Sequence, residues 1–359
     1  MSERLRIGVV GCGAIARQVH LPLLRRRADV QLVAMADNDP NKLPDVVLRY
    51  RGVPAYTSME DMLADGNLDA VVITLPTGMH AAAARAALAA GLHVFVEKPL
   101  ADSLEDAGAV LDAWRQSGRV GVVGFNCRAN PLNVRLRELV GAGRAGEPAY
   151  MRTVFATARR DMPAWKRHRA TGGGALLDLG AHHIDLLRFI GRREISGVHA
   201  TITSRITEHD TVLLDLEFDG GVLGHAFFSL AGAETDHVEV HGDRARLSVR
   251  RFTSLDVDVV DNPGPDGGGL RRVLRRAGTL RHLGRALRAR RAPLREPGYA
   301  ALLDGFIRAA RGGAPDPDMP GIADGFACAA VIDAAERSAE SGRMEAPAPV
   351  PTMPRTVLR

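Results

Sequence analysis

The stretch Ile7-Gly8-Val9-Val10-Gly11-Cys12-Gly13-Ala14-Ile15-Ala16 decides the fold of this chain. It is a G-x-G-x-x-A motif between an apolar strand and a predicted helix over 14–26. Gly11 permits a tight turn, Gly13 lets the backbone approach a pyrophosphate, and Ala16 lets the helix pack closely on the strand. Because the N-terminus of a helix presents unpaired N–H groups, we interpret the stretch as a dinucleotide-binding turn rather than one with incidental glycines.

An acidic residue follows the second predicted strand. Asp37 comes directly after Gln31–Ala36, at the distance where a carboxylate binds the ribose hydroxyls of a dinucleotide. Its charge would repel a 2′-phosphate, and no arginine follows it closely. The sequence therefore predicts NAD as the cofactor and disfavours NADP.

The first 124 residues alternate strands with helices, which predicts an α/β fold built on a doubly wound parallel Rossmann sheet. The strands are nearly continuous in apolar residues, as strands covered on both faces are. We predict them at Leu5–Val10, Gln31–Ala36, Ala70–Thr74, Val94–Glu97 and Val120–Phe125, with helices near Ala14–Arg26, Ser58–Ala64, Met79–Ala90 and Ser103–Ser117.

The pattern changes after residue 124. Several period-2 runs follow one another without intervening helices, which predicts a C-terminal α/β domain with a largely antiparallel open sheet. We expect an NAD-binding domain over 1–124, a substrate-binding and oligomerisation domain over 125–345, and a loose proline-rich tail over 346–359.

Composition narrows the class of protein. The 359 residues are 46% hydrophobic and 25% charged, which is typical of a globular protein. The chain has no run of 18 apolar residues, so we predict no membrane span. The start of the chain lacks the apolar core of a signal peptide, and three scattered cysteines give neither a disulfide framework nor a metal site. We expect a cytoplasmic protein with no metal and no membrane partner.

The net charge of +5 has a local origin. Ten arginines and no acid lie between Leu270 and Arg295, so the rest of the chain is acidic overall. Leucines repeat at helical spacing through this segment. We therefore predict an amphipathic helix packed on its own protein and expect no binding of nucleic acid.

Two further segments carry polar side chains suited to chemistry. Lys98 follows the strand Val94–Glu97, at the edge of a doubly wound sheet that faces ligands. The predicted helix after Gly174 is apolar nearly all round except for a stripe of Asp178, His182 and Asp185. His182 suits a general base that Asp178 orients from one turn earlier. His183 falls in the apolar arc, which predicts a core histidine.

An ordered set of motifs resembles the glucose-fructose oxidoreductase, inositol dehydrogenase and rhizopine catabolism (Gfo/Idh/MocA) family. The motifs are the glycine turn, Thr74-Leu75-Pro76-Thr77 with His80, Glu97-Lys98-Pro99, Gly124-Phe125-Asn126, and the run from Gly172 to Asp185. The resemblance covers most of residues 1–340. It implies NAD(P)-dependent oxidation or reduction of a sugar or cyclitol, and a homodimer or homotetramer formed through the open sheet.

The resemblance also implies roles for individual residues, read by position. The implied catalytic set is Lys98, Asp178 and His182. The implied cofactor-binding residues are Gly11, Gly13, Ala14, Ile15, Asp37, Asn38, Thr74, Leu75, Thr77, His80, Glu97, Lys98 and Asn126. Substrate contacts are predicted at Arg128, Trp165, Lys166 and Asp185.

These inferences converge on a hydride transfer. His182 would take the proton of a substrate hydroxyl while Lys98 stabilises the charge that develops on its oxygen. Three alternatives stay open: a ketoreductase for nucleotide-linked sugars, a glycosidase that recycles NAD, and a non-enzymatic NAD-binding sensor. The presence of Lys98, Asp178 and His182 together disfavours the sensor.

Overall fold

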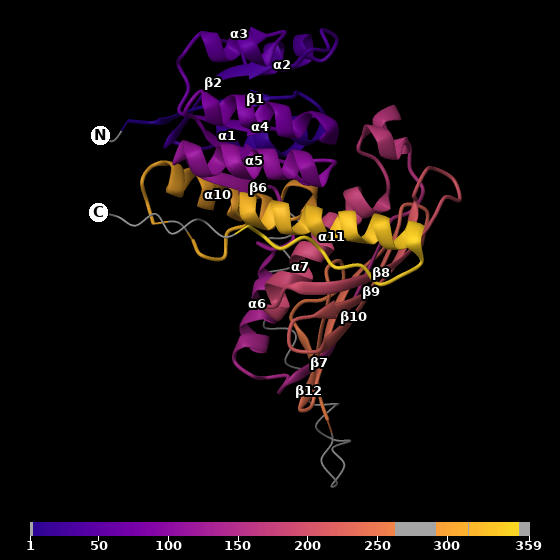
Figure 1. The fold of residues 1–359 in the computed structure, drawn as a ribbon. Coiled ribbons are helices and arrows are strands. Elements are labelled where there is room, and N and C mark those ends of the chain that lie inside the picture. Colours follow the sequence, from indigo (N-terminus) through magenta and orange to yellow (C-terminus); the bar gives the residue numbers. More distant parts are fainter. Residues whose placement is uncertain (1–2, 263–291, 315, 352–359) are drawn as a thin grey trace, which may run out of the picture.

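Six parallel strands form the first sheet of the computed structural model, which describes residues 3–262, 292–314 and 316–351 (Figure 1). The strand order β3-β2-β1-β4-β5-β6 reverses direction beside β1, as in a doubly wound fold. The strands are β1 (Leu5–Val10), β2 (Val30–Ala36), β3 (Ala55–Tyr56), β4 (Ala70–Ile73), β5 (His93–Val96) and β6 (Gly121–Val123).

Helices cover both faces of this sheet, because neighbouring residues of each buried strand point to opposite sides. Ile7 and Val9 pack into one hydrophobic cluster, whereas Val10 packs into the other. The first cluster receives η1 (Ala16–His20), α1 (Leu21–Arg25) and α2 (Leu43–Arg49), and the second receives α3 (Met59–Ala64), α4 (His80–Ala89) and α5 (Leu104–Ser117). Ser58 and Ser103 cap α3 and α5 through their hydroxyls.

Seven strands form the second sheet, in the order β13-β12-β11-β7-β10-β9-β8. All neighbours pair antiparallel except β7 and β10, which are parallel. The strands are β7 (Pro148–Ala156), β8 (Ile195–Thr203), β9 (Thr211–Phe218), β10 (Val222–Ser229), β11 (Thr235–Gly242), β12 (Ala245–Arg250) and β13 (Asp258–Asp261). Helices α6 (Pro131–Gly141) and α7 (Ala181–Gly191) pack against this sheet.

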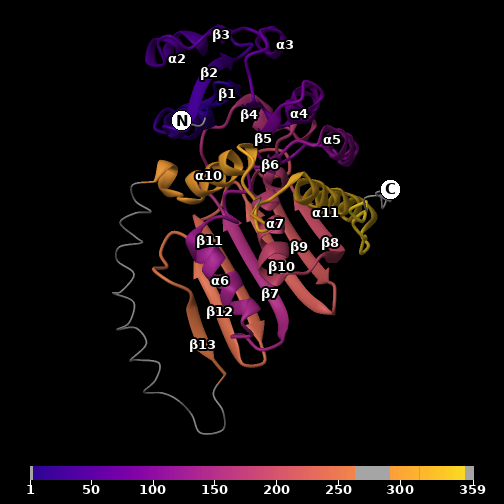
Figure 2. The ribbon, with the colours of Figure 1, turned by 90° about the vertical axis from the view of Figure 1, so that its left-hand side faces the viewer.

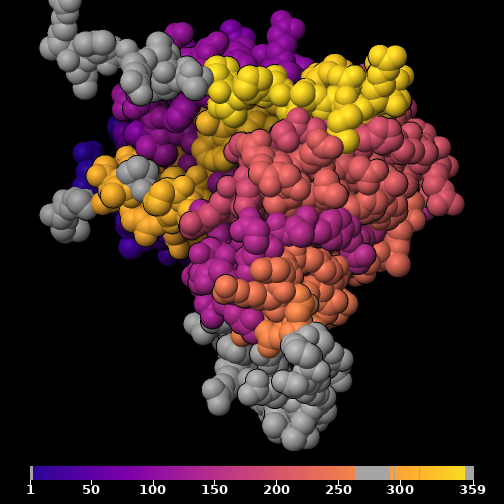
Figure 3. All heavy atoms as spheres, turned by 60° about the horizontal axis from the view of Figure 1, so that its bottom comes forward, coloured from indigo at the N-terminus to yellow at the C-terminus, as the bar shows by residue number. Residues whose placement is uncertain are grey.

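The last helices connect the two sheets. Helix α10 (Gly298–Ala310) inserts Leu302, Leu303, Phe306 and Ile307 into the cluster on the first sheet. Helix α11 (Ile322–Ser341) packs against both α5 and β8, and in Figure 3 its yellow surface lies between the violet first domain and the pink second domain. In Figure 2, α10 lies to the left of β6 at about the same height. Although the sequence analysis assigns α10 to the second domain, it completes the core of the first.

The predicted fold class is confirmed, and the differences are local. The two-residue strand β3 and the short helix α2 have too little apolar pattern to be predicted. Residues 346–351 of the predicted loose tail pack partly against the core through Ala348 and Val350, and the remaining tail residues lie outside the described part of the chain. The predicted arginine-rich helix also lies outside it up to residue 291.

No helix within residues 3–262, 292–314 and 316–351 combines the length and the apolar character that a bilayer crossing requires.

Candidate active site

The predicted cofactor residues lie after the carboxyl ends of five neighbouring strands of the first sheet, which is the edge where doubly wound folds bind ligands. Gly11, Gly13, Ala14 and Ile15 follow β1, Asp37 and Asn38 follow β2, Thr74, Leu75, Thr77 and His80 follow β4, Glu97 and Lys98 follow β5, and Asn126 follows β6.

The glycine turn has the backbone that its motif requires. Gly11 has a φ of 90°, and a Cβ there would lie 2.7 Å from the carbonyl oxygen of Thr74. The Thr74 hydroxyl donates to the carbonyl oxygen of Gly11 at 2.6 Å, which joins the turn to β4. Among the described residues, a Cβ on Gly13 would meet no atom within 4 Å beyond its own chain neighbours. The turn therefore leaves room for a pyrophosphate at Gly13.

Asp37 is tied to this turn. Its carboxylate accepts the backbone N–H of Cys12 at 2.7 Å and that of Asp39 at 2.9 Å, and Lys42 Nζ lies 3.4 Å from Oδ1. Asp37 is buried, whereas its neighbour Asn38 is exposed. The carboxylate is thus held beside the glycine turn, which fits a site for the ribose of a dinucleotide.

Two buried histidines contact the segments that follow β4 and β5. The ring nitrogens of His80 lie 2.7 Å from the Pro99 carbonyl oxygen and 2.8 Å from that of Leu75, so His80 joins the loops after β4 and β5. His20 Nε2 lies 2.7 Å from Glu97 Oε1. The sequence analysis missed His20, because only the fold brings the helix after the glycine turn beside β5. The Lys98–Pro99 peptide bond is cis.

Asp178 holds two lysines at this edge. Lys98 Nζ donates to the Asp178 carbonyl oxygen at 2.5 Å and to Oδ1 at 3.1 Å, and Lys166 Nζ donates to the same Oδ1 at 2.7 Å. Burial would raise the pKa of Asp178, but the two ammonium groups outweigh it and hold this pKa well below its ordinary value. Burial lowers the pKa of Lys166. Trp165 lies beside this pair, with its ring centroid 5.3 Å from Lys166 Nζ.

The predicted contact between Asp178 and His182 is wrong. Within the described residues His182 has no hydrogen-bond partner, and its buried Nδ1 is unsatisfied. Leu176–Gly180 (η5) is a π-helical turn, closed by the bond from the Ala181 N–H to the Leu176 carbonyl. The Asp178 carboxylate instead accepts hydrogen bonds from Lys98 and Lys166.

His182 is suited to accept a proton. It is buried, and burial, Lys98 and Arg251 hold the pKa of its imidazole well below the ordinary histidine value. The ring is therefore neutral near pH 7, the form a general base requires. The chemistry available here is proton removal by His182 beside an ammonium that can stabilise an oxyanion.

His183 is the predicted core histidine. It is fully buried, its Nδ1 contacts the Thr153 hydroxyl, and its Nε2 lies 3.5 Å from Asp236 Oδ1. Its ring stacks on Phe155 with centroids 4.8 Å apart. These contacts join α7 to the second sheet.

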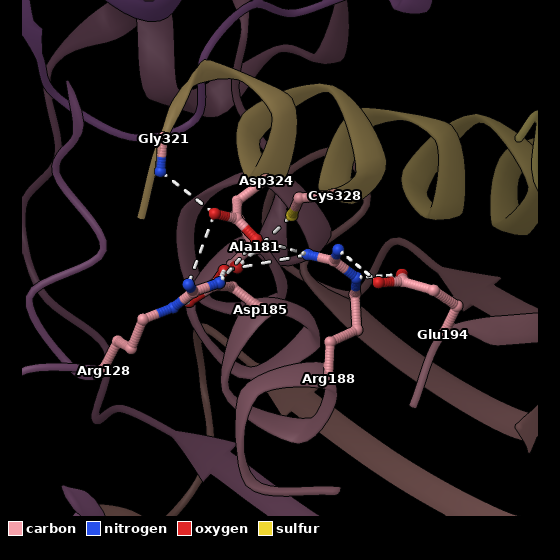
Figure 4. A network of polar contacts seen from close by, with 8 residues as sticks. All are labelled: Arg128, Ala181, Asp185, Arg188, Glu194, Gly321, Asp324 and Cys328. Carbon is pink, nitrogen blue, oxygen red and sulfur yellow. Dashed lines mark hydrogen bonds and ion pairs between the residues drawn. The ribbon is translucent and has the colours of Figure 1, made fainter. Parts of the chain in front are cut away.

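Arg128 and Asp185, which the sequence analysis predicts as substrate contacts, are buried and paired with each other. Arg128 Nε donates to Asp185 at 3.0 Å, and its Nη2 donates to Asp324 at 2.9 Å (Figure 4). Asp324 also accepts the N–H of Gly321 at the start of α11, and Arg188 extends the network. Because Arg128 and Asp185 are buried and paired with each other, we assign them to the junction of α7, α11 and the loop after β6.

Comparisons with known proteins identify relatives of both domains. The model of an oxidoreductase family with an NAD-binding Rossmann fold matches residues 5–125, and the GFO/IDH/MocA C-terminal domain model matches residues 133–248. The chain is 28% identical to the myo-inositol 2-dehydrogenase of Thermotoga maritima over 73% of this chain and 80% of that protein. It is 29% identical to the dTDP-3,4-didehydro-2,6-dideoxy-alpha-D-glucose 3-reductase of Saccharopolyspora spinosa over 70% of this chain and 77% of that protein.

A solved structure extends the likeness to nearly the whole fold. GenD2 from gentamicin A biosynthesis, solved in complex with NAD, aligns with a TM-score of 0.80 and 29% identity. The alignment covers 96% of this chain and 97% of that one. Both family models, the two sheets and the residues at the carboxyl edge of the first sheet lead to one conclusion. The chain belongs to the GFO/IDH/MocA family of NAD-binding oxidoreductases that act on CH–OH groups.

Proposed function

We propose that this protein is an NAD-dependent dehydrogenase of a sugar, cyclitol or related polyol. The observation that carries the proposal is the buried imidazole of His182, which has no hydrogen-bond partner within the described residues, near the Lys98 ammonium that Asp178 holds. The relationship to a protein named as a myo-inositol 2-dehydrogenase supports a polyhydroxylated substrate.

The chain supplies three functions in the proposed reaction. His182 accepts the proton of the substrate hydroxyl, because its neutral ring has free acceptor capacity. Lys98 stabilises the charge that develops on the same oxygen, and Asp178 positions the Lys98 ammonium through two acceptor atoms. NAD⁺, held by the residues of the glycine turn and Asp37, would supply the hydride acceptor for the carbon that carries this oxygen. In reduction the imidazolium of His182 returns the proton.

The purified protein tests this proposal. It would be incubated with NAD and a panel of inositols, aldoses and uronic acids, and absorbance at the NADH band would be followed. We expect NADH to form with at least one polyol and Lys98→Ala to abolish its formation. Glycoside cleavage without net NADH would instead favour an NAD-recycling glycosidase, and an inert panel with tight NAD binding would favour a sensor.

A nucleotide-linked sugar is the second candidate substrate. It is supported by the relationship to a protein named as a reductase of a dTDP-linked sugar and by the basic side chains of the loop before η5. Reduction of such a sugar would consume NADH, so the same assay detects it as a fall in absorbance.

The open face of the second sheet supports the proposed homo-oligomer. Leu223 on β10 is 56% exposed, and Asp215 and Glu217 on β9 are exposed on the same face. A second copy of the chain could cover this face. Light scattering should give a dimer or tetramer mass, and Leu223→Arg should lower it if this face is the interface.

A further inference from the structure

A basic pocket lies beside the Asp178–lysine group. Its volume is about 250 Å³. Part of its lining comes from the segment after β7, and the rest comes from the turn between β8 and β9 and from the end of β10. The lining residues are Arg159, Arg160, Asp161, Met162, Arg167, Ile206, Thr207, Asp210, Leu230 and Ala231.

The two acids of the lining do not neutralise its three arginines. The Asp210 carboxylate accepts the backbone N–H groups of Ile206 at 2.6 Å and Thr207 at 2.9 Å, and also the Thr211 hydroxyl. These bonds fold the turn between β8 and β9 and commit this carboxylate to its own loop. Asp161 is exposed and, within the described residues, forms no ion pair.

The guanidinium groups are free to receive a ligand. Within the described part of the chain Arg159 has no ion pair or hydrogen-bond partner for its side chain. Arg167 donates from Nε to the neutral carbonyl of Met162 at 3.1 Å, which leaves its terminal nitrogens unused. The pocket therefore holds positive charge in excess, and Arg side chains present the planar pair of donors that carboxylates and phosphates accept.

Arg160 connects the pocket to the site of the reaction. Its Nη2 lies 3.6 Å from Asp178 Oδ2, on the carboxylate whose other oxygen holds Lys98 and Lys166. A molecule with its hydroxyl at Lys98 and His182 can thus extend past Asp178 toward Arg159 and Arg167. The path holds five cations, Lys98, Lys166, Arg159, Arg160 and Arg167, against the three acids Asp178, Asp161 and Asp210, so its net charge is positive.

We propose that this pocket binds an anionic group, a carboxylate or a phosphoryl group, carried by the same substrate whose hydroxyl reacts at His182. The inference rests on the proposed dehydrogenase function and specifies its substrate class. The substrate is a polyol acid or a phosphorylated sugar, and Arg159 and Arg167 determine the preference for it over a neutral polyol.

Matched substrates distinguish the two sources of the anion. Rates with NAD would be compared for glucose against glucuronate, against glucose 6-phosphate and against UDP-glucose. We expect kcat/KM for at least one anionic member to exceed that for glucose by about tenfold to a hundredfold, mostly through KM. Preference for glucuronate assigns a carboxylate, whereas preference for either phosphorylated sugar assigns a phosphoryl group. Equal kcat/KM for all four would overturn the proposal.

Substitutions locate the preference in the pocket. The double variant Arg159→Gln with Arg167→Gln should reduce the ratio of anionic to neutral kcat/KM by at least tenfold. Arg135→Gln is the matched control, because Arg135 is exposed on α6 and pairs only with Glu138 within the described residues. Arg135→Gln should leave the ratio of anionic to neutral kcat/KM unchanged. An unchanged ratio in the double variant would contradict the proposal.

A binding measurement separates this inference from the proposed function. Calorimetric titration of the NAD-loaded protein with glucuronate, glucose 6-phosphate and UDP-glucose requires no turnover. If the double variant loses this binding and no probe is oxidised or reduced, the anion pocket stands and the dehydrogenase proposal fails. If neutral polyols are oxidised, and neither the unaltered protein nor the double variant binds the anionic probes more tightly than glucose, the dehydrogenase function stands and the pocket proposal fails.

Discussion

Lys98 and Lys166 share one carboxylate oxygen of Asp178, and this arrangement sets the charge at the reacting hydroxyl. The single negative charge of Asp178 balances one of the two ammonium groups and leaves one positive charge in excess. The surplus charge favours an alkoxide-like oxygen and disfavours protonation of His182. Asp178 therefore positions Lys98, while burial and the Lys98 ammonium lower the pKa of His182 and keep its ring neutral.

We expect the two adjacent histidines to respond differently to substitution. His182→Ala should abolish turnover with little change in melting temperature or NAD affinity, because the proton acceptor is lost and His182 makes no hydrogen bond within the described residues. His183→Ala should mainly lower the free energy of unfolding, by about 1–3 kcal/mol, because it removes a buried imidazole and its contacts with Thr153 and Asp236. Single-turnover rates and melting curves for both variants provide the measurement. The reverse pattern would contradict the assignment of His182 as base.

The pH dependence of oxidation follows from the lowered pKa of His182. Protonated His182 cannot accept a proton, so activity is lost as pH falls through its pKa in the folded protein. Because that pKa lies well below the ordinary value of about 6.5, kcat should stay level from about pH 8 down through 6.5 and fall only in more acid solution. A profile with its midpoint at 6.5 or above would show that the ring is not held neutral.

Asp37 should determine the choice of cofactor. Its buried carboxylate is fixed beside the glycine turn and would repel a 2′-phosphate. NAD should bind more tightly than NADP, and Asp37→Ala should narrow the difference. Fluorescence titration with NADH and NADPH measures both affinities, and equal affinity in the unaltered protein would refute the prediction. Asp39→Ala serves as a control, because Asp39 is only half-buried and lies outside the turn.

At the scale of elements, the sequence predicts strands well where burial is regular, but it does not predict partners that come from distant segments. The predicted strand Leu5–Val10 matches β1 residue for residue, because five of its six residues are buried. The stripe of Asp178, His182 and Asp185 could be predicted, but the partners of Asp178 could not, because Lys98 and Lys166 come from other segments of the chain.

The partners of Arg128 illustrate the same limit. Its sequence position after Gly-Phe-Asn favours a substrate contact, yet its actual partners come from α7 and α11. Asp324 is 196 positions away along the chain. Only the packing of α11 across both domains brings these charges together, and no local pattern encodes that packing.

The buried network at this junction should be strongly non-additive. Arg128→Met alone leaves Asp185 buried without its main partner and should cost about 3–5 kcal/mol of unfolding free energy, and Asp185→Leu alone should cost a similar amount. The double variant removes both charges and should cost less than the sum, because Asp324 keeps Arg188 and the N–H of Gly321. Denaturant unfolding of the four proteins gives the coupling energy. Additive losses would mean that the pair contributes nothing as a unit.

At the scale of the whole molecule, the first domain should be unable to fold by itself. Leu302, Leu303, Phe306 and Ile307 of α10 complete the hydrophobic cluster that contains Ile7, Val9 and Phe95. We expect a fragment of residues 1–124 to be largely unfolded and to bind NAD poorly. The same fragment joined through a glycine-serine linker to residues 297–311 should regain both folding and NAD affinity. Circular dichroism and NADH fluorescence test this, and a stable, NAD-binding 1–124 fragment would contradict it.

The return of α10 to the first sheet also has a consequence for biosynthesis. Residues 1–124 emerge from the ribosome early, but Phe306 and Ile307 emerge only after most of the chain has been made. At about 5–20 residues per second, this delay is roughly 10–40 seconds. Throughout that interval one face of the nascent sheet, including Ile7 and Phe95, has no helix from the C-terminal part to cover it. The nascent chain therefore exposes an apolar surface to which chaperones that act during translation can bind.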